Sequence, residues 1–184
     1  MAHENISSSS ESDEVMMMDE IIRKGYTPGT IGRMAELHAI YYNEKWGFGL
    51  FFEAKVAIDL SEFLSRYDES RDGFWTLSLN NQIEGGIAID GIKAMTEGAH
   101  LRWFIVSQGT QGRGFGNRLM EKALSFCKER HYSHVYLWTF EGLYAARHLY
   151  EKFGFKLSKQ AEGTQWGTRV IEQKFELQNF QLLS

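Results

Sequence analysis

Apolar and aromatic residues recur every three or four positions in two segments near the start of the chain. In the first segment, which follows Pro28 and Gly29, they are Ile31, Met34, Leu37, His38 and Tyr41. In the second they are Phe52, Val56, Leu60, Phe63, Leu64 and Tyr67. This spacing places side chains on one face of a helix, so it predicts two amphipathic helices. Two glycines among aromatic residues, in "WGFGLFF", predict a bent connection between them.

The pattern then changes to the alternation of β-strands. Residues 73–90, "GFWTLSLNNQIEGGIAID", hold two β-rich runs about Asn80 and Asn81, which predicts a hairpin. Alternation over residues 100–106 predicts a central strand. Its two faces would carry Leu101, Trp103 and Ile105 on one side and His100, Arg102, Phe104 and Val106 on the other.

The remaining segments alternate between helix and strand. Leu119, Met120, Ala123, Leu124 and Cys127 form one apolar stripe of a helix. Residues 134–140, "HVYLWTF", predict a strand, residues 144–153 a shorter helix ending at Gly154, and residues 168–177 a last strand. Strands and helices that are mixed in this way indicate an α/β (α+β) fold.

The ends of the chain differ in composition from its middle. Residues 1–20 are rich in serine and acids and poor in large apolar residues, so we expect a disordered tail there. The 184 residues are 43% hydrophobic, and the length suits one domain, which we place at residues 21–178 with a C-terminal tail at 179–184.

Charge and cysteine content exclude several classes of protein. A formal net charge of −4 without a long Lys/Arg run argues against nucleic acid as a partner. No apolar run approaches the roughly 18 residues of a membrane helix, and nothing resembles a secretory signal. The one cysteine, Cys127, cannot form an internal disulfide and falls on the apolar stripe of its helix. We therefore expect a cytoplasmic protein that does not bind membranes, and we predict no metal site.

A glycine-rich turn, "QGTQGRGFGN", joins the central strand to the helix that follows it. Such a turn presents unpaired backbone N–H groups and the positive end of the helix dipole, which together bind phosphate. The ending Gly116-Asn117-Arg118 does not fit a Walker loop, which ends in Gly-Lys-Ser/Thr. The G-x-G-x-G spacing, after two helices and a hairpin, fits a dinucleotide fingerprint poorly.

Residues 111–116, "QGRGFG", after a strand resemble the Q/R-x-x-G-x-G/A pyrophosphate loop of the GNAT superfamily of acyl-CoA-dependent N-acetyltransferases. Residues 145–155, "AARHLYEKFGF", look like the helix-then-strand segment that closes the coenzyme groove of that family. Within the superfamily, residues 137–155 look most like the acetyltransferase half of MarR-GNAT fusion proteins. The resemblance implies a mixed, mostly antiparallel central sheet flanked by helices, with a V-shaped coenzyme cleft between two central strands.

The resemblance also implies acetyl-CoA as acyl donor, an amine as acceptor and, as in many relatives, a homodimer. The residues expected to bind the coenzyme are Phe104, Ile105, Val106, Gln111, Gly112, Arg113, Gly114, Phe115, Gly116, Asn117, Arg147 and Tyr150. Two positions depart from the family pattern. Gln108 stands where a proline is common, and Glu141 stands where many members have an asparagine.

The implied reaction is direct attack of a primary amine, of a small molecule or a peptide, on the thioester carbonyl. Tyr150 matches the tyrosine that protonates the leaving thiolate in many relatives. Glu97, His100 and Glu141 are candidates for the base, and the sequence does not choose among them. The alternative function is a non-catalytic acyl-CoA-binding module, which senses the coenzyme or docks to a partner.

Overall fold

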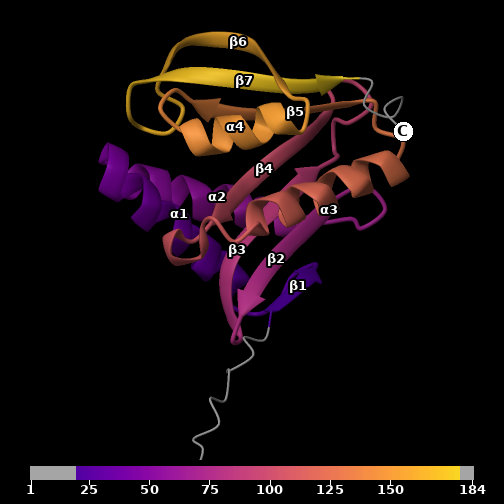
Figure 1. The fold of residues 1–184 in the computed structure, drawn as a ribbon, viewed down its shortest axis with the longest axis horizontal. Coiled ribbons are helices and arrows are strands. Elements are labelled where there is room, and N and C mark those ends of the chain that lie inside the picture. The colour runs from indigo at the N-terminus through magenta and orange to yellow at the C-terminus, as the bar shows by residue number, and fades with distance from the viewer. Residues whose placement is uncertain (1–19, 179–184) are drawn as a thin grey trace, which may run out of the picture.

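The computed structural model describes residues 20–178, which form one seven-stranded sheet flanked by four α-helices (Figure 1). The strand order is β1-β2-β3-β4-β5-β7-β6. Every neighbouring pair is antiparallel except β4 and β5. The strands are β1 Glu20–Lys24, β2 Gly73–Leu79, β3 Gln82–Asp90, β4 Ala99–Val106, β5 His134–Phe140, β6 Lys156–Gly163 and β7 Val170–Gln178. The mixed, mostly antiparallel sheet is thereby confirmed.

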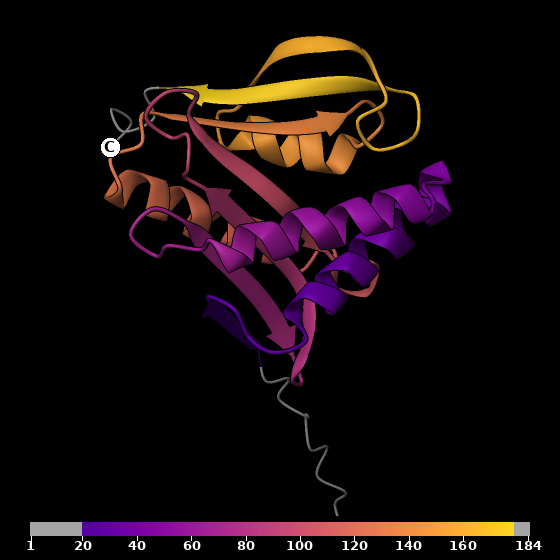
Figure 2. The ribbon, with the colours of Figure 1, turned by 180° about the vertical axis from the view of Figure 1, so that it is seen from behind.

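The helices cover both faces of the sheet. They are α1 Thr30–Trp46, α2 Leu50–Ser65, α3 Phe115–Glu129 and α4 Tyr144–Lys152. Helices α3 and α4 lie on the face seen in Figure 1, and α1 and α2 cross the opposite face in Figure 2. Two apolar cores result. The stripe of α3 packs on Trp75, Leu77 and Leu101, whereas α1 and α2 pack on Phe74, Trp103 and Ile105.

The amphipathic helices and the hairpin are confirmed. Asn80 and Asn81 both have positive φ, 49° and 65°, as a two-residue turn of the hairpin type requires. Two strands have no counterpart among the predicted elements. Strand β6 has almost no apolar alternation because nearly all of its residues are exposed, and β1 is a short edge strand.

Strand β1 begins at Glu20, the last residue of the segment that the sequence assigns to an N-terminal tail. The rest of that segment, and the tail predicted at 179–184, lie outside the described residues.

A β-bulge in β4 overturns the predicted alternation of its faces. Gly86 pairs with Ile105 and Ala88 with Arg102, so Ile87 alone opposes both Trp103 and Phe104. Trp103 has a φ of 47°, which is unusual for a bulky residue. The extra residue switches the faces, so Leu101 lies in the α3 core while Trp103 lies in the α1–α2 core.

Strands β4 and β5 pair over two positions only, Ala99 with Val135 and His100 with Tyr136. Beyond them the two strands diverge, as the V between β4 and β5 in Figure 1 shows. The backbone edge of β4 after His100 is therefore not covered by its neighbour, which opens a cleft between the two central strands.

The close approach of β3 to β4 next to the bulge predicts opposite effects for two Gly→Ala changes. A Cβ at Gly85 would lie 2.7 Å from the backbone oxygen of Ile105, whereas Gly32, in α1, has nothing within 4 Å of that position. We expect Gly85→Ala to lower the free energy of unfolding by about 1–3 kcal/mol. Gly32→Ala should raise it by about 0.5–1 kcal/mol. Urea titrations of the three proteins measure both effects, and an unchanged midpoint for Gly85→Ala would contradict the close approach.

Candidate active site

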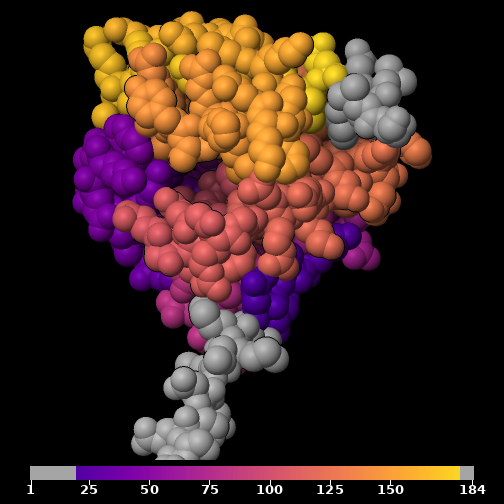
Figure 3. Space-filling view, in the orientation of Figure 1, coloured from indigo at the N-terminus to yellow at the C-terminus, as the bar shows by residue number. Residues whose placement is uncertain are grey.

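Two cavities meet in the cleft between β4 and β5. The larger, of about 500 Å³, is a groove between the glycine turn, β4 and α4. The smaller, of about 200 Å³, lies between β4, β5, α1, α2 and the β6–β7 connection. Tyr42, Phe104 and Tyr150 line both cavities. The hollow beneath α4 in Figure 3 marks this region on the surface.

The glycine turn leads directly into α3 and lines the groove. Gly112 and Gly114 each have a φ of 81°, which favours glycine, and Gly114 is the residue that caps the helix. A Cβ at Gly116 would lie 3.3 Å from the ring of Phe104, so the helix approaches β4 closely there. The backbone N–H groups of the first turn of α3 have no partners within the helix, which suits an anion.

Ten of the twelve residues expected to bind the coenzyme line this groove. They are Phe104, Ile105, Val106, Gln111, Gly112, Gly114, Phe115, Gly116, Asn117 and Tyr150. Gln111 also braces the turn, because its Nε2 donates to the carbonyl of Val106 at 3.3 Å.

Two arginines expected at the coenzyme do not line the groove. The guanidinium of Arg113 lies over the ring of Phe115 at 4.8 Å, and Arg147 pairs with Glu151 at 2.8 Å on the exposed side of α4. His148 and Lys152 line the groove instead, and Lys152 donates to Oδ1 of Asn117. Their four-residue spacing places both on one face of α4. This spacing is visible in the sequence and could have indicated that both face the groove.

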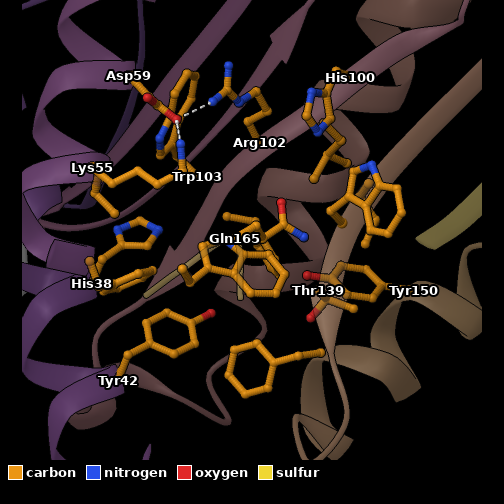
Figure 4. Close-up of a pocket in the computed structure, with 18 residues that line it drawn as sticks. His38, Tyr42, Lys55, Asp59, His100, Arg102, Trp103, Thr139, Tyr150 and Gln165 are labelled. Atoms are coloured by element: carbon orange, nitrogen blue, oxygen red, sulfur yellow. Dashed lines mark hydrogen bonds and ion pairs between the residues drawn. The ribbon is translucent and has the colours of Figure 1, made fainter. Parts of the chain in front are cut away.

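The smaller cavity combines aromatic walls with a few polar groups (Figure 4). Its aromatic residues are Tyr42, Phe52, Trp103, Phe104, Trp138, Phe140, Tyr150 and Trp166. Its polar residues are His38, Lys55, Asp59, His100, Arg102, Thr139 and Gln165. About half of these residues come from α1, α2 and the β6–β7 connection, which lie far apart in the sequence and carry no local motif.

One end of the smaller cavity is charged. Nζ of Lys55 and Nη2 of Arg102 each lie 3.0 Å from the same carboxylate oxygen of Asp59. Arg102 also approaches Asp90 at 3.6 Å, but Asp90 is held by a shorter contact with Arg66. Figure 4 shows Lys55, Asp59 and Arg102 together, across the cavity from Thr139 and Tyr150.

Two histidines of this cavity are neutral at pH 7. Burial lowers the pKa of His38 to about 4. Its Nδ1 lies 2.7 Å from the carbonyl of Met34, which can only accept, so Nδ1 carries the proton and Nε2 has a free lone pair. Burial, with the charge of Arg102, lowers the pKa of His100 to about 3. The ring of His100 stacks on Tyr136 at 4.4 Å.

The two carboxylates considered as bases lie elsewhere. Glu97 is exposed, pairs with Lys93 at 2.8 Å and faces a separate depression next to His100. Glu141 is exposed, and neither cavity is lined by it. The structure therefore brings only His100, of the three predicted bases, to the cavity that contains Tyr150. Within residues 20–178, no group of three or more His, Cys, Asp or Glu side chains could hold a metal ion.

Tyr150 lies where the two cavities meet. Its side chain is 6% exposed and packs against the rings of Phe104, Phe155 and Phe175. Burial raises its pKa, so the hydroxyl keeps its proton at neutral pH. It can therefore donate a hydrogen bond or a proton to a group in the cleft.

A family model described as the acetyltransferase (GNAT) family matches residues 31–155. The chain belongs to this family. The match spans α1 to the end of α4, and so includes the glycine turn and Tyr150. A search of curated protein sequences gives no match. Among the residues described, no helix is long and apolar enough to cross a membrane.

Solved structures of GNAT acetyltransferases share the fold at low sequence identity. An acetyltransferase from Streptococcus agalactiae 2603 is 18% identical with a TM-score of 0.67, and the alignment covers 86% of this chain and 98% of that one. The protein yncA from Salmonella typhimurium, solved with its cofactor acetyl-CoA, is 14% identical with a TM-score of 0.66, covering 86% and 93%. The ribosomal-protein-S18-alanine N-acetyltransferase of Escherichia coli is 18% identical with a TM-score of 0.62, covering 88% and 94%.

The burial of His38 predicts how stability depends on pH. An unfolded histidine binds a proton near pH 6.5, whereas His38 in the folded protein binds one only near pH 4. Above pH 6.5 the histidine is neutral in both states, and its contribution to stability is complete. As the pH falls towards 4, the unfolded state binds a proton that the folded state does not, so the free energy of unfolding decreases. A shift of one pKa unit is worth about 1.4 kcal/mol. Between pH 7.5 and 4.5, the free energy of unfolding of the wild type should therefore fall by about 2–3 kcal/mol more than that of His38→Asn.

Urea titrations of both proteins at several pH values measure that difference. Asparagine does not titrate but keeps a donor for the Met34 carbonyl, and the other titrating groups are common to both proteins and cancel. Parallel pH profiles would show that His38 takes up a proton near its ordinary pKa in the folded state.

Proposed function

We propose that this protein transfers an acetyl group from acetyl-CoA to a primary amine by direct attack of the amine on the thioester. The observation that carries the proposal is the meeting of the two cavities at Tyr150, one with a glycine turn suited to an anion and the other with aromatic walls. The bound cofactor of yncA and the likeness of residues 137–155 to the acetyltransferase half of MarR-GNAT proteins support the same reading.

The groove suits the coenzyme along its length. The N–H groups of the turn and the start of α3 would receive the pyrophosphate, and the ammonium of Lys152 adds positive charge beside them. Phe104, Ile105 and Val106 lie on the edge of β4 that β5 leaves uncovered, where a pantetheine amide could pair like a strand. The thioester would then reach Tyr150.

The smaller cavity would hold the amine. A lysine-like amine with a pKa near 10.4 is almost wholly protonated at pH 7, so a proton must leave before or during attack. The proton of the free ammonium would pass to solvent, and the neutral amine would attack the thioester carbonyl. We infer that the free Nε2 of His38 takes the second proton, from the cationic nitrogen of the adduct, with His100 as the other neutral imidazole of the cavity. That nitrogen is more acidic than the free ammonium, which suits a base of low pKa. Tyr150 would donate to the departing sulfur.

Calorimetric titration with acetyl-CoA tests the groove. Gly114 and Gly29 make a matched pair, because each has a positive φ of 81° or 89°, caps a helix and has nothing within 4 Å of its Cβ position. Gly114→Glu should weaken binding by at least about tenfold, equal to about 1.4 kcal/mol, because it adds bulk and negative charge where the pyrophosphate would lie. Gly29→Glu should bind as wild type does. Equal affinities in the two variants, or no binding by wild type, would contradict the proposed groove.

Loss of the Tyr150 hydroxyl tests the chemistry. Tyr150→Phe should lower kcat about tenfold to a hundredfold while the Kd for acetyl-CoA stays within about twofold, because the ring packing is kept. Tyr132→Phe is the control, since Tyr132 is also buried but its hydroxyl donates to the carbonyl of Arg71. Thiol release with an amine panel gives kcat. Tight coenzyme binding without turnover of any amine would favour the non-catalytic module.

A further inference from the structure

The charged end of the smaller cavity bears on the identity of the acceptor. Resting on the proposed function, we propose that the acceptor is a compact amine that also carries a carboxylate, with Lys55 and Arg102 binding the carboxylate and Tyr150 lying near the amine. An apolar or aromatic amino acid has this chemistry.

The size and the walls of the cavity favour a compact, largely apolar body. Its volume is about 200 Å³, and three tryptophans, two tyrosines and three phenylalanines are among its lining residues. Phe140 contacts both Trp46 and Trp166, at centroid distances of 5.3 and 5.5 Å, so this wall is continuous with the aromatic cluster of α1. A wall of rings is suited to hydrocarbon or aromatic groups.

The sign of the charge favours an anion. Of the described residues that line the cavity, the ionised ones are Lys55, Arg102 and Asp59, since His38 and His100 are neutral. Two cations therefore share one carboxylate. The side chains of all three keep some exposure, 35% for Lys55 and 24% for the other two, so the cations can still reach a ligand. A carboxylate placed there would complete two ion pairs.

A second ammonium would be disfavoured at the same place. A polyamine or a lysine side chain would bring a third cation to Asp59, which already accepts from Lys55 and Arg102 through one oxygen. The Asp90 carboxylate behind Arg102 does not change this balance, because Arg66 pairs with it.

The positions of the groups suit a molecule with an amine near its carboxylate. Figure 4 shows Arg102 and Asp59 on one side of the cavity, with Thr139 and Tyr150 on the other and Gln165 between them. Lys55 and Asp59 come from α2, Arg102 from β4 and Tyr150 from α4, so the sheet and its helices fix the two ends relative to each other. One small acceptor can therefore contact both ends.

Matched pairs of amines that differ only in the carboxylate test this inference. L-phenylalanine is compared with 2-phenylethylamine, and L-leucine with 3-methylbutylamine, by thiol release from acetyl-CoA. Spermidine and a lysine peptide are included as acceptors that have no carboxylate close to the reacting amine. We expect kcat/KM to be about tenfold higher for the carboxylate member of at least one pair, as two charge-assisted contacts would give.

Lys55→Met removes one cation but keeps the apolar stem. It should reduce that preference about fivefold, through KM for the carboxylate member. Lys122→Met, an exposed change on α3, should leave the preference unchanged.

The outcomes separate the inference from the proposed function. A preference for the carboxylate-free members, or a preference that Lys55→Met does not change, overturns the inference. Turnover of spermidine or the lysine peptide, with none of the amino acids, overturns the inference and leaves the acetyltransferase function standing. No thiol release with any acceptor would overturn the proposed function and the inference together.

Discussion

The incomplete pairing of β4 and β5 is the constraint on which the rest of the site depends. Two parallel pairs at the start of β4 hold the halves of the sheet together, and beyond His100 the strands separate. The bulge at Trp103 lies where they separate and turns the following residues to the opposite faces. Because a closed sheet would pair the edge of β4, neither cavity could exist without this divergence.

The two cavities place different demands on the chain. The groove depends on the backbone. It needs N–H groups that no side chain covers, and a helix that starts close to a strand. The positive φ of Gly114 and the missing side chain of Gly116 permit this arrangement. The smaller cavity needs side chains from several separate elements, with its histidines kept neutral by burial and its charged residues paired with one another. His38 is an example. Burial disfavours its charged form, so the imidazole stays neutral, and the hydrogen bond to the carbonyl of Met34 fixes its orientation.

This difference explains what could be predicted from the sequence. The glycine turn, the helix of Tyr150 and the Asn80-Asn81 hairpin are local features, and each lies as predicted. The faces of β4 could not be predicted, because a bulge depends on how β3 and β4 pack and leaves no mark in the alternation. Strand β6 is held by pairing with β7 while its side chains face solvent, so periodicity does not detect it.

Four polar residues of the smaller cavity, His38, Lys55, Asp59 and Arg102, were missed for a related reason. His38 lies on the apolar stripe of α1, where it was interpreted as a helix-packing residue, and only the neighbouring strands turn it into a cavity wall. Lys55 and Asp59 are four apart on α2, a spacing that also fits an ordinary surface pair. Arg102, which reaches Asp59 from β4, joins the pair to one end of the smaller cavity, and no local pattern in the sequence indicates this contact.

Separate origins also let the two halves of the site vary independently. The groove comes mainly from β4, the turn and α4, whereas the charged end takes Lys55 and Asp59 from α2 and only Arg102 from β4. A substitution at Lys55 or Gln165 would change the smaller cavity without touching the turn. The fold itself is shared with solved structures at 14–20% identity, so few of the residues that line either cavity are needed to specify it.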